Sequence, residues 1–371
     1  MSNTAEDLLF DLTLTDDQRM NRETMQRFAA QEIRVIAQDV DRGEAAVGDF
    51  YAKAAELGLS LLPIPEALGG AGMDRSPVSN VLICEDLAHG DMAMALGSVA
   101  PLGFVNTVLD QGSDAQKEKY LPRFCSGEFV PATTALIEPS ITFEPSAPRA
   151  SATTSGDGFS LNGTKSMVPL GADAELVLVI AQLDDKGPAA FIVEGTPEGM
   201  QRTPEENMGL AGAQLATLTF DNVQLAEEAL LGEGTFDLQR FLDLSRLGLC
   251  ALAVGTCQAV LDYVIPYCNE RVAFGEPISH RQSVAFLIAD IGIELEAMRL
   301  MTWRAAALAE RGEDFHEAAY LAKKQCGDYA MKIGTDGVQL LGGHGFCCEH
   351  PVELWYRSLR AIDILDGVAS V

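Results

Sequence analysis

Apolar residues recur every three or four positions over residues 242–290, the most regular stretch of the chain. The apolar set of its first half is Leu247, Cys250, Leu252, Val254, Val260, Leu261 and Val264. The pattern breaks at Phe274-Gly275-Glu276-Pro277 and resumes near Ser279, and a third helical pattern covers residues 315–341. This spacing predicts a row of long helices, with a stiff Gly/Pro turn between the first two.

Helical spacing also dominates the N-terminal third. It predicts helices over residues 16–39, 51–57, 78–96 and 113–124, with a Pro- and Gly-rich turn region after the second. The predicted helix over residues 78–96 carries Glu85 and Asp86, a pair of carboxylates that also occurs in metal sites. On a helix such carboxylates more often form a solvated or ion-paired face.

Strand patterns replace helical ones after Val130. The segments 176–183, 189–194 and 215–220 are short, rich in β-branched residues and bounded by turn formers, as strands are. Gly156-Asp157-Gly158 and Asn162-Gly163 are typical of hairpin turns. The prediction is therefore a mostly α fold with a β-domain insert. We place a helical domain at residues 1–129, a β-domain at 130–231 and a helical domain at 232–371.

Composition narrows the possible functions. The net charge of −28 argues against binding to nucleic acid or to anionic membranes, and an anionic ligand must be met by local positive charge. No window reaches the roughly 18 uninterrupted apolar residues of a membrane span. The acidic N-terminus lacks the basic and then apolar pattern of a signal peptide. Eight cysteines without a CxxC pair indicate reduced thiols and a cytoplasmic location.

Arg271 is a candidate anion ligand, because Gly275 and Pro277 stiffen the turn beside it. The alternative is an Arg that merely caps a helix C-terminus. The wider pattern R-x-x-F-G-x-P-I-x-x-x-Q is completed by Phe274, Ile278 and Gln282.

This pattern, together with QLLGGHGFCCEHPVELWYRSLRAIDILDG at residues 339–367, resembles the acyl-CoA dehydrogenase family over nearly the whole chain. The resemblance implies an N-terminal helical domain, a middle β-domain and a C-terminal four-helix-type bundle. It also implies FAD as cofactor, an acyl-CoA substrate in fatty acid or steroid degradation, and an electron-transfer flavoprotein as acceptor.

The family removes the α-proton of an acyl-CoA thioester while a flavin takes hydride from the β-carbon. The family's usual base is a Glu before Gly-Thr, and Asp366 stands at that position, before Gly367 and Val368. Asp is one methylene shorter, a loss of reach of about 1.5 Å. A misplacement on the order of 1 Å can cost roughly 100-fold in rate. The alternative is a helix-end carboxylate without a catalytic role.

Some family members place the base just before an Arg of the first long C-terminal helix. Arg246 matches that Arg, but Ser245 precedes it, so no second base is present. Asp243 and Arg246 match positions that face the CoA arm of the substrate. They are alternatively an ordinary i,i+3 ion pair on a helix.

By the same resemblance, one half of the FAD site is intact. In the family, this half binds the adenosine and pyrophosphate of a neighbouring subunit's FAD. The matching residues are Arg271, Phe274, Gln282, Gln339 and Gly343. An Arg suits a pyrophosphate because its charge is permanent and its geometry bidentate.

The half that meets the isoalloxazine ring departs from the family pattern. Ile137 replaces the Thr whose hydroxyl meets the flavin, and Phe143 replaces a Ser. Met167 replaces the Trp that packs on the ring. Pro169 replaces a Thr and offers neither a hydroxyl nor a main-chain N–H.

Two main hypotheses follow. The first is an FAD-dependent acyl-CoA dehydrogenase with a divergent pocket and Asp366 as base. The second is a non-catalytic subunit that completes the FAD site of another acyl-CoA dehydrogenase chain, as in the heterotetrameric members of sterol side-chain breakdown. The run Lys165–Pro169 is similar to that group. Both predict at least a dimer. A third hypothesis, thiol chemistry at Cys347-Cys348, rests on the adjacent pair alone.

Overall fold

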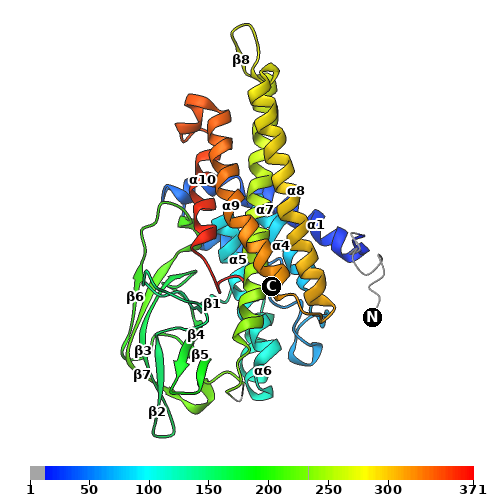
Figure 1. Cartoon of the computed structure of the whole chain (residues 1–371). Helices are drawn as coiled ribbons and strands as arrows, with labels where there is room; N and C mark the ends of the chain where they lie inside the picture. The colour runs from blue at the N-terminus through cyan, green and yellow to red at the C-terminus, as the bar shows by residue number, and fades with distance from the viewer. Residues whose placement is uncertain (1–12, 233) are drawn as a thin grey trace.

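The computed structural model describes residues 13–232 and 234–371, so most of the acidic N-terminal stretch considered above lies outside the described residues. Helices from both ends of the chain pack around a buried centre, and a β-sheet covers one side (Figure 1). This is the helical, β and helical order that the sequence predicts.

The N-terminal region is helical. Its elements are α1 (Asp16–Phe28), a π-helical turn (Ala29–Ile33), α2 (Ala37–Asp41), α3 (Gly48–Ala55), a 3-10 turn (Glu66–Leu68), α4 (Pro77–Ala88), α5 (Met92–Gln111), α6 (Asp114–Tyr120) and a second 3-10 turn (Leu121–Cys125). The single helix predicted over residues 78–96 is wrong. Helix α4 ends at Ala88, because Asp91 caps a new helix by accepting a hydrogen bond from the Met94 N–H at 2.9 Å.

Seven strands of the described part of the chain form one sheet. They are β1 (Ala132–Ala135), β2 (Ser151–Ser155), β3 (Gly158–Val168), β4 (Leu176–Leu183), β5 (Gly187–Glu194), β6 (Met200–Pro204) and β7 (Ala216–Ala226). Gly156 lies in the β2–β3 hairpin as predicted, at φ +59°. Asn162-Gly163 is not a hairpin: it lies inside β3, where the pairing with β7 shifts register. Short 3-10 turns at Ala211–Ala213 and Glu227–Ala229 flank β7.

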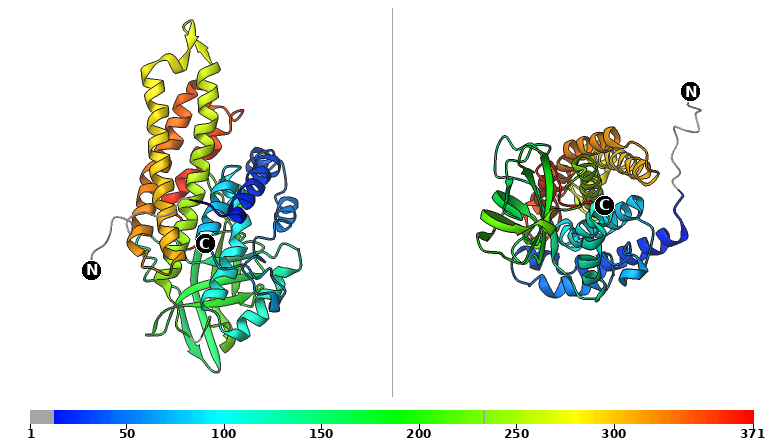
Figure 2. Two further views of the ribbon diagram at one scale, coloured as in Figure 1. Left: turned by 90° about the vertical axis from the view of Figure 1, so that its right-hand side faces the viewer. Right: turned by 90° about the horizontal axis from the view of Figure 1, so that it is seen from below.

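The C-terminal region contains the longest helices. Its elements are α7 (Leu238–Glu270), the two-residue strands β8 (Val272–Ala273) and β9 (Glu276–Pro277), a 3-10 turn (Ile278–His280), α8 (Gln282–Glu310), α9 (His316–Leu340), a 3-10 turn (Gly342–Phe346), α10 (Val352–Leu359) and a 3-10 turn (Arg360–Asp363). The α7–α8 pair projects beyond the rest of the molecule and carries the β8–β9 hairpin at its tip (Figures 1 and 2).

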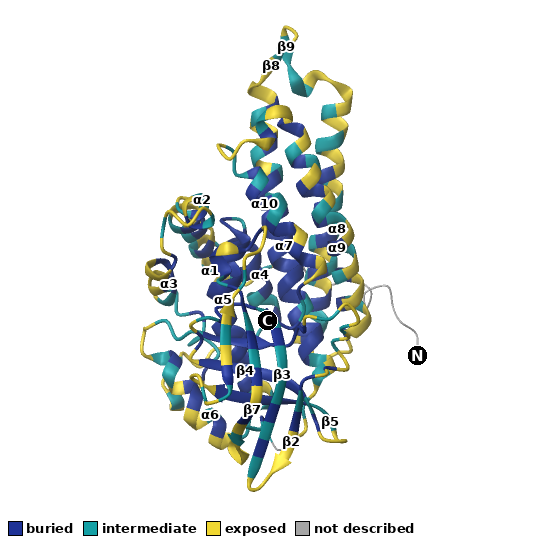
Figure 3. Cartoon of the chain, turned by 90° about the vertical axis from the view of Figure 1, so that its left-hand side faces the viewer, coloured by how far each residue is buried: buried dark blue, intermediate teal, exposed yellow. Residues whose placement is uncertain are grey.

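The core centres on α5 and the first half of α7. Every residue from Met92 to Val108 is buried, whereas most residues at the projecting ends of α7 and α8 are exposed or half-buried (Figure 3). Helices α5 and α7 are long and apolar enough to cross a membrane by composition, but 94% and 72% of their most apolar windows are buried inside the protein. Gly255 permits close packing of α7 on α4, because a Cβ there would lie 2.0 Å from the Glu85 carbonyl oxygen.

Candidate functional site

Asp366 lies between α7 and α9 at the end of a chain of charged and polar contacts. It follows the 3-10 turn Arg360–Asp363 and faces Arg246 of α7, with Arg246 Nη2 and Asp366 Oδ2 3.3 Å apart. Arg246 also pairs with Asp243 at 3.2 Å, and Asp243 approaches His316 Nδ1 of α9 at 3.0 Å. The predicted base and the predicted CoA-facing pair therefore form one cluster.

The Asp366 carboxylate is largely buried, and burial is the main reason why its pKa is raised. The positive charges of Arg246 and Lys323, and a hydrogen bond from the Gly367 N–H, oppose part of that rise. A raised pKa makes a carboxylate a stronger base, which suits proton abstraction from a weakly acidic carbon.

Two members of this cluster were not predicted from the sequence. His316 begins α9, and Lys323 lies two turns further along it and donates from Nζ to the Ile362 carbonyl oxygen at 2.6 Å. Both are more than 40 residues from Asp366 in the chain. No local pattern signals a contact that only the packing of α9 against α7 creates.

The predicted residues of the intact FAD half-site gather at the projecting end of the helical region. Phe274 is 97% exposed at the hairpin tip and adopts φ +56°, and Gln282 begins α8. Gln339 and Gly343 are exposed near the end of α9. The Tyr267 hydroxyl donates to the Leu341 carbonyl oxygen at 3.3 Å, which ties this end of α9 to α7 one turn before Arg271.

Arg271 is the C-cap residue of α7, but its main chain does the capping: its N–H donates to the Tyr267 carbonyl oxygen at 2.9 Å. The nearby carboxylate of Glu276 pairs with Arg281 at 3.1 Å instead. Within the described residues, the exposed Arg271 side chain has no ion pair. Its guanidinium is therefore available to an anion from outside the chain.

The residues of the half predicted to meet the isoalloxazine ring, here called the ring half, turn inward. Ile137 is buried, while Phe143 and Met167 are partly buried and pack against the hydrophobic core. The Met167 N–H donates to Glu205 Oε1 at 2.9 Å, so this main-chain donor is already used. Pro169 is buried and has no N–H to offer. These side chains do not fit the polar edge of an isoalloxazine ring.

A buried ion pair anchors the same region. Lys165 of β3 is fully buried and donates to Glu138 at 2.8 Å and to the Leu136 carbonyl oxygen at 2.9 Å. Burial lowers the pKa of Lys165, and the Glu138 carboxylate offsets part of that drop. Burial alone would raise the pKa of Glu138, but hydrogen bonds from Lys165 and two main-chain N–H groups hold it below its usual value. This pair therefore connects β3 to the segment that contains Ile137.

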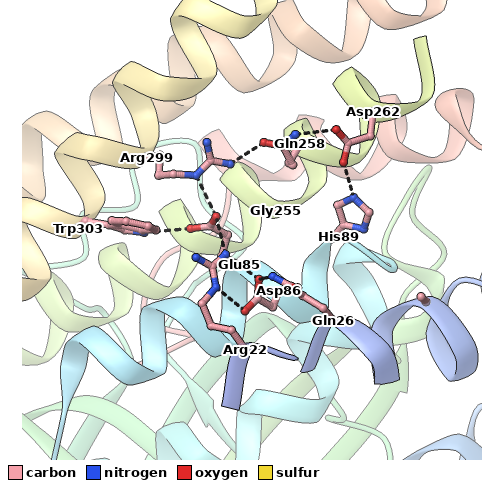
Figure 4. A pocket seen from close by; sticks show the side chains of 11 residues that line it. Arg22, Gln26, Glu85, Asp86, His89, Gly255, Gln258, Asp262, Arg299 and Trp303 are labelled. Atoms are coloured by element: carbon pink, nitrogen blue, oxygen red, sulfur yellow. Dashed lines mark hydrogen bonds and ion pairs between the residues drawn. The ribbon is translucent and has the colours of Figure 1, made fainter. Parts of the chain in front are cut away.

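Glu85 and Asp86 line a cavity of about 580 Å³ between α1, α4, α7 and α8 (Figure 4). Glu85 accepts hydrogen bonds from Arg299 Nε at 2.9 Å and Trp303 Nε1 at 3.0 Å, and Asp86 accepts from Arg22 at 2.8 Å. The two carboxylates are ion-paired as the sequence indicated, although buried rather than solvated. Among the described residues, no group of three or more metal-ligating side chains occurs.

Comparison with known families agrees with this architecture. Residues 15–128 match the acyl-CoA dehydrogenase N-terminal domain, residues 133–223 the middle domain and residues 232–371 the C-terminal domain. Together these matches cover almost the whole chain.

Individual acyl-CoA dehydrogenases also match this chain over most of its length. The rat mitochondrial short-chain specific acyl-CoA dehydrogenase is 32% identical over 96% of this chain and 88% of its own length. An acyl-CoA dehydrogenase of Bacillus subtilis is 32% identical over 96% of both chains. The solved structure of butyryl-CoA dehydrogenase from Megasphaera elsdenii superposes with a TM-score of 0.88 at 30% identity, covering 96% of this chain and 95% of its own.

The chain belongs to the acyl-CoA dehydrogenase family. The predicted fold, a helical domain, a middle β-domain and a C-terminal helical domain, is confirmed. The predicted enzyme class, acyl-CoA dehydrogenase, is confirmed as well by the relatives from rat and Bacillus subtilis. The roles of Asp366, Arg271 and the other site residues stay predictions.

Proposed function

We propose that this chain takes part in α,β-dehydrogenation of an acyl-CoA thioester and that Asp366 accepts the α-proton. The observation that carries this proposal is the Asp366–Arg246 pair, a largely buried carboxylate held at 3.3 Å by a cation. Burial raises the basicity of the carboxylate, and Arg246 fixes its position.

The surroundings of the pair suit a CoA thioester in an otherwise acidic protein. Arg246 and Lys323 supply local positive charge on the side where α7 and α9 meet. His316 of the same cluster is about half exposed, so the cluster reaches the surface. A polar CoA arm would lie on this exposed side, with the acyl chain directed towards the buried side of Asp366.

A second candidate function is favoured by the two halves of the FAD site. In this alternative the chain lends Arg271, Gln282 and Gln339 to the FAD of a partner, while its own ring half, with Phe143 and Met167 packed inward, binds no flavin. FAD would then be shared between subunits rather than held by this chain alone.

Either function needs an oligomer, and α8 offers a surface for one. Phe286, Ile293 and Leu300 recur at seven-residue intervals and are 62%, 66% and 41% exposed. Seven-residue spacing keeps apolar side chains on one face of a helix. A second acyl-CoA dehydrogenase chain, identical or different, would cover this stripe, as exposed apolar patches of this kind usually require.

The same proposal includes an electron acceptor for the flavin and a cellular location for the chain. Electron-transfer flavoprotein would reoxidise the flavin, as the resemblance to the family implies. A cytoplasmic location is supported by the eight cysteines, all of which are free thiols.

Flavin content and activity test the two candidates together. The protein is purified alone, and FAD per chain is measured after dialysis, followed by dye-coupled oxidation of a panel of acyl-CoA thioesters. About one FAD per chain with turnover supports the dehydrogenase. Almost no FAD, with flavin and turnover restored by a second family chain, supports the partner subunit. If FAD binding and turnover were both absent in every combination, both candidate functions would be refuted.

A further inference from the structure

The cavity beside Glu85 and Asp86 lies outside the predicted acyl-CoA site. Asp366 meets α7 at Arg246, whereas the cavity meets α7 further along the helix, at residues 255–262 (Figure 4). Its volume of about 580 Å³ falls within the range of small-molecule sites, roughly 300–1,000 Å³. None of the roles proposed above uses this space, so it is a separate candidate for a ligand.

Hydrogen bonds tie the side chains of the cavity wall to one another. Arg299 Nη2 donates to Gln258 Oε1 at 2.7 Å, and Gln258 Nε2 donates to Asp262 Oδ1 at 2.8 Å. Asp262 Oδ2 lies 2.9 Å from Nε2 of His89. Side chains bonded in this way along the wall stay out of the open space between them, so the cavity is preorganised for a ligand.

The wall carries one more carboxylate than guanidinium. Its charged residues are Glu85, Asp86 and Asp262 against Arg22 and Arg299. The two carboxylates of α4 are almost fully buried and pair with the two arginines. Asp262 is 53% exposed and pairs with no Lys or Arg of the described residues. With a neutral histidine beside it, the excess negative charge therefore lies at Asp262, on the exposed side of the cavity.

Arg34 is near enough to act electrostatically on Asp262, but its guanidinium is held elsewhere. Its Nε donates to the Gly90 carbonyl oxygen at 2.9 Å, and its Cζ lies over the Trp355 ring, 4.4 Å from the centroid. Arg34 therefore reduces the negative charge at Asp262 without occupying the acceptor sites of that carboxylate.

Unused acceptors also favour a cationic ligand. Each oxygen of Asp262 has one hydrogen-bond partner, and a carboxylate oxygen has room for two. Gln26 Nε2 donates to Asp86 at 3.0 Å, and no donor among the described residues bonds Gln26 Oε1. An ammonium group has three N–H donors and no acceptor, which matches these oxygens. Ala30 and the ring of Trp303 add an apolar surface to the same wall.

We propose that this cavity binds a primary amine in its ammonium form, with a short apolar body. The ammonium group donates to Asp262 and Gln26, and the apolar body lies against Ala30 and the Trp303 ring. This site is independent of the proposed acyl-CoA function, because the cavity and the cluster at Asp366 share no residue.

Butylamine, 1-butanol and butyrate test the proposal on the wild-type assembly at pH 7, because they have similar bodies and differ in the charge of the head group. Binding is followed by NMR of the two tryptophan indole N–H groups. The Trp303 signal should shift saturably with butylamine, and the fully buried Trp355 is the reference. Butylamine should bind at least about fivefold more tightly than butanol, and butyrate should not bind. No saturable shift, or equal affinities for butylamine and butanol, would overturn the proposal.

Two variants place the ligand within the cavity. Asp262→Asn removes the excess charge and keeps the shape, so it should weaken butylamine binding about fivefold. Ala30→Leu fills part of the space and should abolish the shift. Asp185→Asn and Ala46→Leu make the same changes at exposed positions elsewhere and are the matched controls. Thermal unfolding checks that each variant is folded. Wild-type butylamine affinity in folded Asp262→Asn or in folded Ala30→Leu would contradict the proposal, whatever the flavin content or turnover of the protein.

Discussion

The two regions that correspond to the family's FAD site differ in where their side chains point. At the projecting end of α7, Arg271 and Phe274 are exposed and take no part in the chain's own packing. Beside the β-domain, Ile137, Phe143 and Met167 pack into the protein's own core. The side chains of the first region are available to a ligand or a partner, whereas those of the second are used by the chain's own core.

The two regions therefore differ in what their side chains contribute to the fold. An exposed Arg without an ion pair contributes little to folding, so its side chain is available to a ligand. Apolar replacements in the ring half, by contrast, add buried area to the chain itself. Substitutions in the two regions should therefore have different effects, on contacts with a ligand or partner in the first and on the chain's own packing in the second.

Asp366→Asn has the largest expected effect. If the chain's own site is catalytic, losing the base should lower turnover of an acyl-CoA at least about 100-fold, because the amide has nearly the same shape but is not a base. Asp366→Glu should preserve or raise turnover, since it restores the family's reach. The assay is anaerobic or dye-coupled oxidation of an acyl-CoA, with and without a partner chain.

Asp363→Asn, an exposed carboxylate three residues away, is the control and should leave turnover unchanged. Full turnover from Asp366→Asn would remove Asp366 from the mechanism. It would then assign the chemistry to the partner's site, which sharpens the contrast between the two regions.

Arg271→Ala should have the next largest effect and concerns the exposed region. Loss of a charge-assisted contact to a pyrophosphate costs roughly 1.5–3 kcal/mol. That is about one to two orders of magnitude in FAD affinity. FAD retained after dialysis of the flavin-containing assembly is the measurement. Arg304→Ala, at an exposed position lower on α8, is the matched control. Equal retention in both variants would mean that the Arg271 side chain has no ligand.

The sequence anticipated the neighbours of Arg271 better than those of Asp366. The residues around Arg271 form a local pattern within a single turn, so spacing alone brings them together. The cluster at Asp366 depends on α9 packing against α7, which places His316 and Lys323 beside residues far away in the chain. No periodicity records such a contact.

The element boundaries show the same limit. Asp91 begins a new helix only because its side chain caps it, and Asn162-Gly163 forms a bulge only because β7 continues alongside. In both places the residues suit two local structures, and the neighbouring elements decide between them. The burial of residues 367–371 was not predicted either, since nothing in these residues indicates burial before α5 and α7 are placed.

Ile293→Asp should have a moderate effect on assembly. It puts a charge in the middle of the exposed stripe on α8, and a carboxylate buried without a partner costs about 1–3 kcal/mol. Subunit dissociation should therefore become roughly 5- to 150-fold easier. Light scattering across a dilution series measures it, with Gln201→Asp on the exposed face of β6 as control. A wild-type chain that stays monomeric at micromolar concentration would contradict the oligomer, and with it the role of the exposed region.

The smallest expected effect concerns stability and the Asp366 carboxylate. Because burial raises the pKa of Asp366, the folded chain holds this proton more tightly than the unfolded chain does. The stability that the protonated group contributes is present below the ordinary Asp pKa of about 3.9 and is lost as the pH rises through the folded pKa. At neutral pH, Asp366→Asn should therefore unfold at a higher temperature than the wild type. That difference should shrink as the pH is lowered towards about 4.

Thermal unfolding followed by circular dichroism measures both chains, and Asp185→Asn, in an exposed turn, should show no such trend. If the wild type were more stable than Asp366→Asn at neutral pH, the ion pair with Arg246 would outweigh the effect of burial. The Asp366 carboxylate would then be held ionised for a structural role rather than as a base.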